Sequence, residues 1–127
     1  MTKRVFIVDD DADFCRACVH FLSVQGYEVG CRDSEQGVVE AVKEFKPDII
    51  FLDMVMKTRT SGFAMAETIY ADTALRTIPL FFLTGYFKKA ALAEQEREIL
   101  RKWPNAKGII DKPVKPGVLL ELIRAAT

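Results

Sequence analysis

The chain lacks the features of a membrane-spanning, secreted or nucleic-acid-binding protein. Its longest apolar runs, at 49–52 and 78–83, are far too short to span a bilayer. Only four apolar residues follow Lys3 and Arg4, so we expect no secretory signal in this stretch. The 18 basic and 18 acidic residues cancel, which leaves no charge imbalance to attract nucleic acid or an anionic membrane. We therefore expect neither partner for this chain alone.

Cysteine and histidine are scarce. Cys15, Cys18 and Cys31 are the only cysteines, and their odd number and low density favour reduced thiols in a cytoplasmic protein. The first two have the C-x-x-C spacing, but they lie inside a predicted helix rather than at a helix N-terminus, where thiolates are stabilised. We interpret them as small buried hydrophobes. His20, the single histidine, is interpreted as a helix-surface residue rather than a phosphodonor.

What the chain does contain is enough apolar sequence for one packed domain. Half of its 127 residues are hydrophobic, and this length suits a single domain with a core. No internal repeat, low-complexity tract or linker interrupts it. We therefore treat residues 1–127 as one domain.

Short apolar runs alternate with helical patterns along the chain. Strands are predicted at 5–8, 27–31, 49–52, 79–83 and 108–110. Helices are predicted at 12–24, 34–45 with Ser34 as N-cap, 63–70, 90–103, and from Pro116 onward. Apolar strands separated by helices indicate a parallel sheet with helices on both faces. The predicted fold is α/β and doubly wound, flavodoxin-like, and strand order 2-1-3-4-5 suits five strands.

The predicted helix at 90–103 is mostly charged, with a thin apolar stripe. Pairs four residues apart, such as Glu98 with Lys102, are expected on its solvated face. Trp103 is expected to anchor the helix by packing.

Polar residues directly follow four of the predicted strands. Strand one is followed by Asp9, Asp10 and a third aspartate, strand three by Asp53, strand four by Thr84, and strand five by Lys112. Because strands one and three are neighbours in this order, we expect their three carboxylates to form one cluster. Two carboxylates about 4 Å apart repel by roughly 4 kcal/mol at an effective dielectric near 20. A cation between them would relieve that repulsion.

An oxygen-only cluster of this kind suits Mg²⁺, which keeps several waters and commonly shares its coordination shell with phosphate. Thr84 offers a hydroxyl donor, and Lys112 offers an ammonium suited to phosphate. A carboxylate can itself accept a phosphoryl group and become an aspartyl phosphate. Such a transfer mainly needs positioning and charge neutralisation, and the cluster can supply both.

This set of motifs resembles the receiver domains of two-component response regulators, over the whole chain. Any single motif is common by chance, whereas the full set in order, each at a strand end, is specific. The motifs are Asp9-Asp10 after strand one, Asp53 followed by Met56, Thr84 followed by Gly85, and Lys112-Pro113.

The resemblance implies that Asp53 is the phosphorylation site. Its phosphoryl group would come from a phosphohistidine of a sensor histidine kinase or a histidine phosphotransfer protein. Asp10, Asp53 and the backbone carbonyl of Val55 would bind Mg²⁺ directly, and Asp9 would reach the metal largely through water. Lys112 would pair with the phosphoryl oxygens.

The resemblance also implies a switch. The Thr84 hydroxyl would move to the phosphoryl group and shift the loop after strand four, so that the surface of the fourth helix and fifth strand changes its affinity for an output partner. Such a protein is a cytoplasmic signalling phosphoacceptor rather than an enzyme, with only self-catalysed phosphorylation and slow autodephosphorylation, which the bulk of Val55 and Tyr86 favours. A homodimer is compatible with this function.

Several features depart from the family pattern. Lys57 stands where receivers usually carry proline, and the loop at 53–62 is one residue longer than usual. Ile109 holds the position of a switch aromatic, and an isoleucine cannot swing a ring inward. The stretch 84–112 is also several residues longer than expected. Because these departures lie on the switch side, we expect a non-standard output surface.

Two other functions fit parts of the sequence. A non-phosphorylated pseudo-receiver, acting only as an interaction module, would tolerate Lys57 and Ile109. A haloacid-dehalogenase-like Mg²⁺-dependent phosphatase also uses strand-end Asp, Thr and Lys residues. Such enzymes, however, require Thr or Val where this chain has Asp13, and a late acidic pair that is absent after Lys112.

Overall fold

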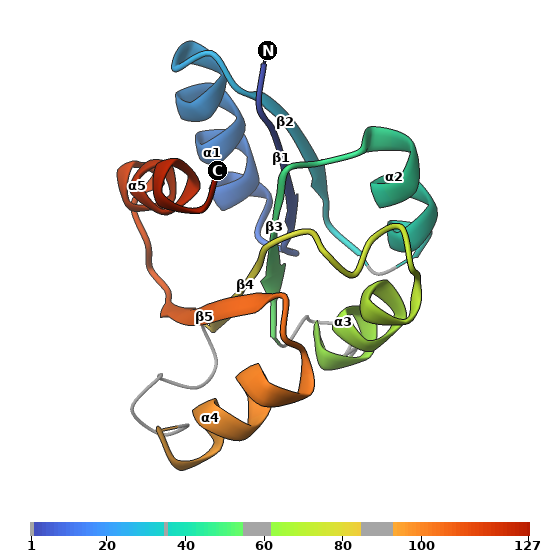
Figure 1. Cartoon of the computed structure of the whole chain (residues 1–127). Helices are drawn as coiled ribbons and strands as arrows, with labels where there is room; N and C mark the ends of the chain where they lie inside the picture. Colours follow the sequence, from blue (N-terminus) through green and yellow to red (C-terminus); the bar gives the residue numbers. More distant parts are fainter. Residues whose placement is uncertain (1, 35, 55–61, 85–92) are drawn as a thin grey trace.

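The computed structural model describes residues 2–34, 36–54, 62–84 and 93–127 (Figure 1). Its five strands are β1 (Arg4–Val8), β2 (Glu28–Arg32), β3 (Ile49–Asp53), β4 (Leu80–Thr84) and β5 (Ala106–Asp111). They form one parallel sheet in the order β2-β1-β3-β4-β5, which confirms the predicted topology. Every residue of β3 and β4 is buried, as continuous apolar runs in a doubly covered sheet require.

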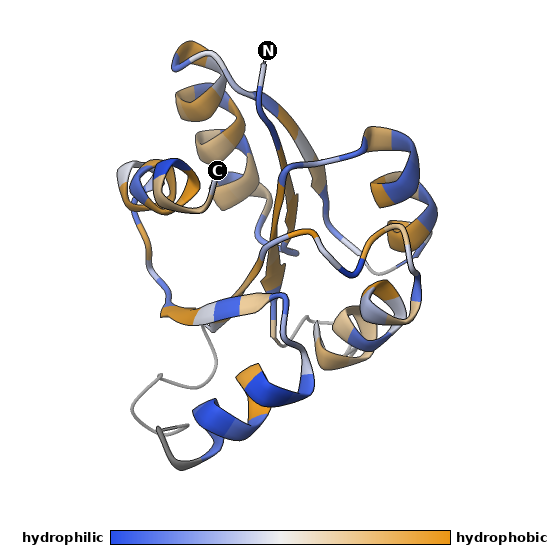
Figure 2. Cartoon of the chain, in the orientation of Figure 1, coloured by the Kyte–Doolittle hydropathy of each residue, from blue (hydrophilic) through white to orange (hydrophobic). Residues whose placement is uncertain are grey.

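Five helices cover the two faces of the sheet. They are α1 (Ala12–Val24), α2 (Val38–Phe45), α3 (Gly62–Ala71), α4 (Ala93–Lys102) and α5 (Pro116–Ala126). Helices α1 and α5 lie together on one face, and α2, α3 and α4 lie on the other (Figure 1). Figure 2 shows that α4 is mostly hydrophilic with only a few hydrophobic positions, whereas the central strands are largely hydrophobic. Within the described part of the chain, no helix has the length and apolarity needed to cross a bilayer.

The sheet divides the apolar core into two layers because successive strand residues point to opposite faces. Under α2, α3 and α4 lie Phe6, Val8, Ile50, Leu52, Phe82 and Ile109, and under α1 and α5 lie Val5, Ile7, Ile49, Phe51, Phe81 and Leu83.

Helix α1 begins and ends where its sequence predicts. Asp11 is the N-cap, and its Oδ1 accepts a hydrogen bond of 3.1 Å from the backbone N–H of Phe14. The prediction for α2 is wrong at its start, because the helix begins at Val38 and Ser34 does not cap it. Gly37 precedes it in the left-handed region at φ 70°, a conformation that interrupts a right-handed helix.

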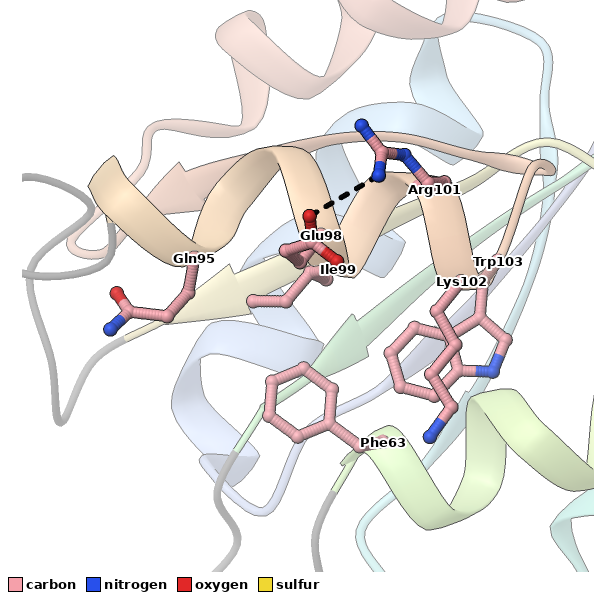
Figure 3. A pocket seen from close by; sticks show the side chains of 7 residues that line it. All are labelled: Phe63, Gln95, Glu98, Ile99, Arg101, Lys102 and Trp103. Carbon is pink, nitrogen blue, oxygen red and sulfur yellow. Dashed lines mark hydrogen bonds and ion pairs between the residues drawn. The ribbon is translucent and has the colours of Figure 1, made fainter.

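Trp103, directly after α4, packs between that helix and α3. Its ring is 4 % exposed and stacks on Phe63 with centroids 5.5 Å apart, and its Nε1 donates a 3.1 Å hydrogen bond to Glu67. The predicted packing role is therefore confirmed. A cavity of about 580 Å³ opens beside the ring between α3 and α4 (Figure 3).

The salt bridges on α4 differ from the predicted pair. Glu98 lies 3.3 Å from Arg101 rather than bonding Lys102, and Lys102 reaches Glu67 of α3 at 3.9 Å. All four side chains are exposed, so these pairs contribute little to stability.

The prediction of three reduced thiols is wrong for two of them, because Cys15 and Cys31 form a disulfide. Cys31 lies beside Ile7 in the β1–β2 register, and α1 packs over these strands on the same face. Spacing along the chain gives no hint of this pairing, which depends on the fold. Cys18 is free and buried as expected; its burial, together with the nearby charge of Asp9, raises the pKa of its thiol to about 12.

Candidate functional site at the carboxyl ends of the strands

Three carboxylates meet at the carboxyl ends of β1 and β3. Val8 pairs with Leu52 in the sheet register, so the residues that follow them, Asp9 and Asp53, lie side by side. Asp9, Asp10 and Asp53 each offer an oxygen within 4.8 Å of the other two. The structure therefore brings together the cluster that strand order implied.

Asp9 is fully buried and is fixed at three points. Its backbone N–H donates a 3.0 Å hydrogen bond to the carbonyl of Arg32 at the end of β2. Its Oδ1 accepts a 2.9 Å hydrogen bond from the backbone N–H of Asp11, and its Oδ2 lies 2.7 Å from the Nζ of Lys112. Asp9 thus connects the ends of β2, β1 and β5.

Lys112 supplies the positive charge of the site. Its Nζ lies 2.7 Å from Asp9 and 3.7 Å from Asp53, and its side chain is only 15 % exposed. The ammonium also lies 5.2 Å from the centre of the Phe14 ring, within cation–π range. Sequence reasoning placed Lys112 at this edge but missed the contact with Phe14.

The environment of Lys112 keeps it charged. Burial by itself would lower the pKa of its ammonium, but the hydrogen bond to Asp9 and the charges of Asp9, Asp53 and Asp11 together raise that pKa above its ordinary value of 10.5. The ammonium therefore offsets part of the repulsion within the carboxylate cluster at neutral pH.

Asp53 and Thr84 are buried at the ends of neighbouring strands, at 4 % and 1 % exposure. The backbone carbonyl of Thr84 accepts a 2.9 Å hydrogen bond from the N–H of Lys112. The N–H of Met54 likewise donates to the carbonyl of Leu83 at 2.8 Å. The strand ends that carry the polar residues are thus hydrogen-bonded to one another. Val55, Met56, Lys57, Gly85 and Tyr86, which sequence analysis singled out, lie outside the described residues.

Gly62 supports the site in a way that the sequence analysis did not foresee. Helix α3 begins at this residue, whose N–H donates a 2.8 Å hydrogen bond to the carbonyl of Met54. A Cβ at this position would lie 2.2 Å from the backbone oxygen of Asp53. Only glycine permits this close approach, and a glycine at the start of a predicted helix is the signal that could have revealed it.

The donor set is suited to a hard divalent cation. The cluster offers carboxylate oxygens only, which Mg²⁺ prefers over nitrogen or sulfur ligands. Asp10 is half-buried, so one side of the cluster faces solvent. Such an opening leaves room for the waters that Mg²⁺ retains.

The fold and this strand-end cluster define a family of signalling domains. The model of the response regulator receiver domain matches residues 5–124. The chain therefore belongs to the response regulator receiver domain family. The fold and family predicted from the sequence are confirmed, and the dehalogenase-like phosphatase is not supported.

Individual relatives agree with this membership. Chemotaxis protein CheY of Thermotoga maritima is 31 % identical over 97 % of this chain and 96 % of its own length. The phosphate regulon transcriptional regulatory protein PhoB of Pseudomonas aeruginosa is 29 % identical over 97 % of this chain, which spans 51 % of PhoB. The solved structure of chemotaxis response regulator CheY4 of Vibrio cholerae matches the fold with a TM-score of 0.82 at 20 % identity, covering 100 % of both chains.

Family membership places the chain in two-component signalling. Response regulators interact with sensor kinases and output partners. Receiver domains generally bind Mg²⁺ at an acidic pocket, and this chain has an aspartate cluster.

Proposed function

We propose that the protein is a phosphoacceptor receiver of a two-component system or phosphorelay, with Asp53 as the acceptor. The observation that carries the proposal is the position of Asp53. It is a buried carboxylate at the end of β3, beside Asp9 and Asp10 and 3.7 Å from the ammonium of Lys112. This arrangement combines a nucleophile, an oxygen-rich metal site and a cation.

In the proposed reaction, a carboxylate oxygen of Asp53 attacks the phosphorus of a phosphohistidine on a sensor kinase or phosphotransfer protein. A P–O bond forms as the P–N bond breaks, and the electron pair of the broken bond returns to the imidazole nitrogen. Lys112 then pairs with the phosphoryl oxygens, which requires it to turn from Asp9. The short distance from its Nζ to Asp53 makes that movement small.

Asp10, Asp53 and the backbone carbonyl of Val55 would hold Mg²⁺, with Asp9 contributing largely through water. When bound, the metal neutralises the charge on the transferred phosphoryl group. The match between this site and Mg²⁺ rests on the three clustered aspartates, which offer only oxygen ligands.

The proposed switch passes through Thr84. Its hydroxyl would hydrogen-bond the phosphoryl group, and its carbonyl already accepts a hydrogen bond from the backbone of Lys112. Ile109 is 2 % exposed and packs in the core beneath α4, and as an aliphatic residue it has no ring that could rotate in the switch. We therefore place the output surface around α4 and β5 and expect it to respond in a non-standard way.

The rest of the proposal follows the family. The chain would work in the cytoplasm as one receiver domain over residues 1–127. It would not bind nucleic acid by itself, would lose its phosphoryl group slowly, and could pair with a second copy. An isolated interaction module without phosphorylation is the alternative that Ile109 favours.

Incubation with acetyl phosphate and Mg²⁺, followed by intact mass measurement, tests the proposal. Wild type should gain one phosphoryl group, and Asp53→Ala should gain none. Asp33→Asn, which changes an exposed aspartate outside the cluster, should behave as wild type. No gain in any of the three would favour the interaction module. Continuous release of phosphate from p-nitrophenyl phosphate would instead indicate a phosphatase.

A further inference from the structure

A disulfide lies directly beside the acidic cluster. It joins Cys15, in the first turns of α1, to Cys31 near the end of β2, with Cα atoms 6.4 Å apart. Cys15 is 8 % exposed and Cys31 is half-buried. The bond therefore ties together the helix and the strand that flank β1 where it delivers Asp9.

Both backbone groups of Asp9 face this bridge. The N–H of Asp9 donates to the carbonyl of Arg32, the residue after Cys31. The carbonyl oxygen of Asp9 lies 3.4 Å from the sulfur of Cys15. As a thiol, Cys15 can donate its proton to that oxygen, whereas as half of a disulfide it has no proton to donate. The oxidation state of one sulfur therefore changes a direct contact to the cluster.

We propose that Cys15 and Cys31 are a reversible redox pair, a modification site whose state sets how firmly Asp9 and its neighbours are held for metal binding. The part of this inference that concerns metal binding rests on the proposed function. In a reducing compartment, protein disulfides are uncommon and those that occur are mostly transient or redox-sensing.

A small-molecule disulfide such as oxidised glutathione is the oxidant by chemical class. The thiolate of Cys31, the more exposed of the two, attacks one sulfur of that disulfide, so that a mixed disulfide forms and one thiolate leaves. Cys15 then attacks the sulfur of Cys31 and releases the second thiolate. Two protein thiols are oxidised and one external disulfide is reduced to two thiols, which take up the two protons that the cysteines lose.

The third cysteine provides an internal contrast. Cys18 lies one turn further along α1, fully buried and free. Its burial keeps the thiol protonated and without access to an oxidant. Oxidation should therefore be confined to Cys15 and Cys31.

The disulfide should strengthen metal binding. It joins residues 16 positions apart and fixes the start of α1 against β2. Asp9 and Asp10 lie just before this closed loop, between β1 and α1, so holding the start of α1 in place also limits their movement. Carboxylates that are already held in place lose less freedom when a cation binds. We expect the oxidised protein to bind Mg²⁺ several-fold more tightly than the reduced protein and to melt several degrees higher.

Thiol counting tests the redox pair without reference to phosphorylation. The protein is equilibrated with dithiothreitol or with oxidised glutathione, denatured in iodoacetamide, and weighed intact. The reduced protein should take three alkyl groups, one per cysteine, and the oxidised protein one, at Cys18. Three groups after oxidation, or a lasting glutathione adduct on Cys31, would overturn the pair.

Calorimetric titration with Mg²⁺ tests the coupling. Wild type should show the several-fold difference between its two forms, and Cys18→Ser should show the same difference. Cys31→Ser, which leaves Cys15 as a permanent thiol, should bind like reduced wild type in both buffers. Equal Mg²⁺ affinity in the two forms of wild type would contradict the coupling. Phosphoryl uptake by the reduced protein tests the proposed function separately, so the two can fail independently.

Discussion

The ammonium of Lys112 lies 2.7 Å from the fully buried carboxylate of Asp9 and is the closest cationic contact that Asp9 makes in the described part of the chain. On a protein surface such a contact would contribute little to stability, but burial removes the screening that weakens surface ion pairs. This contact connects the residue after β1 with the residue after β5, at the carboxyl ends of the strands. The ion pair therefore affects both the stability of the fold and the charge balance of the candidate site.

Removal of Lys112 should leave Asp9 and Asp53 without their compensating charge. Lys112→Ala is expected to lower the free energy of unfolding by about 3 kcal/mol, because breaking a buried pair strands the remaining charge. Urea denaturation measures this loss. Millimolar Mg²⁺ should restore more stability to the variant than it adds to wild type. Lys107→Ala, which removes an exposed lysine of β5, should change little, and an equal effect of the two would refute the role given to Lys112.

Gly62 should tolerate no side chain. Gly62→Ala would place a methyl group 2.2 Å from the backbone oxygen of Asp53, and we expect a loss of about 1–3 kcal/mol from this overpacking. Slower phosphorylation by acetyl phosphate should accompany the loss. Gly117→Ala is the matched control, since a Cβ there meets no atom within 4 Å and should stabilise α5 by about 0.5–1 kcal/mol. Chemical denaturation of both variants tests this, and equal stability changes in the two would contradict the role given to Gly62.

Trp103 should stabilise the contact between α3 and α4. Trp103→Ala is expected to cost about 3–5 kcal/mol because it empties a buried site. Trp103→Phe retains a ring to stack on Phe63 but loses the hydrogen bond to Glu67, at a cost of about 1 kcal/mol. Val24→Ala, at an exposed position, should stay within about 0.5 kcal/mol of wild type. A different order in urea denaturation would contradict this packing.

Cys18 should make stability fall in alkaline solution. Its pKa is raised by burial from 9.0 to about 12 in the folded protein, so the unfolded chain loses this proton first. The stabilising contribution is complete below pH 9 and is lost as the pH rises toward 12. Between pH 8 and pH 10, wild type should lose about 1.4 kcal/mol more than Cys18→Ala. If the stabilities of the two proteins fall equally between pH 8 and pH 10, burial does not raise the pKa of Cys18 and the prediction is wrong.

Much of the fold could be predicted from the sequence because its signals are local. Continuous apolar runs identified β3 and β4, and apolar residues at helical spacing located α1. The strand order then followed from the general topology of such sheets. That order in turn predicted that Asp9 and Asp53 lie close together.

Other features depend on contacts that no local pattern encodes. The start of α2 was missed because a left-handed Gly37 overrides the capping tendency of Ser34. The disulfide depends on packing between α1 and β2. The contact of Phe14 with Lys112 joins residues at opposite ends of the chain. Each of these is set by tertiary structure rather than by spacing.

The measurement that tests the account most directly is the location of the phosphoryl group. Protein treated with acetyl phosphate and Mg²⁺ is reduced with borohydride, which converts an aspartyl phosphate to homoserine, and its peptides are sequenced by mass spectrometry. We predict conversion at residue 53 alone. Conversion at Asp9 or Asp10, or phosphate found only on His20, would contradict the central claim.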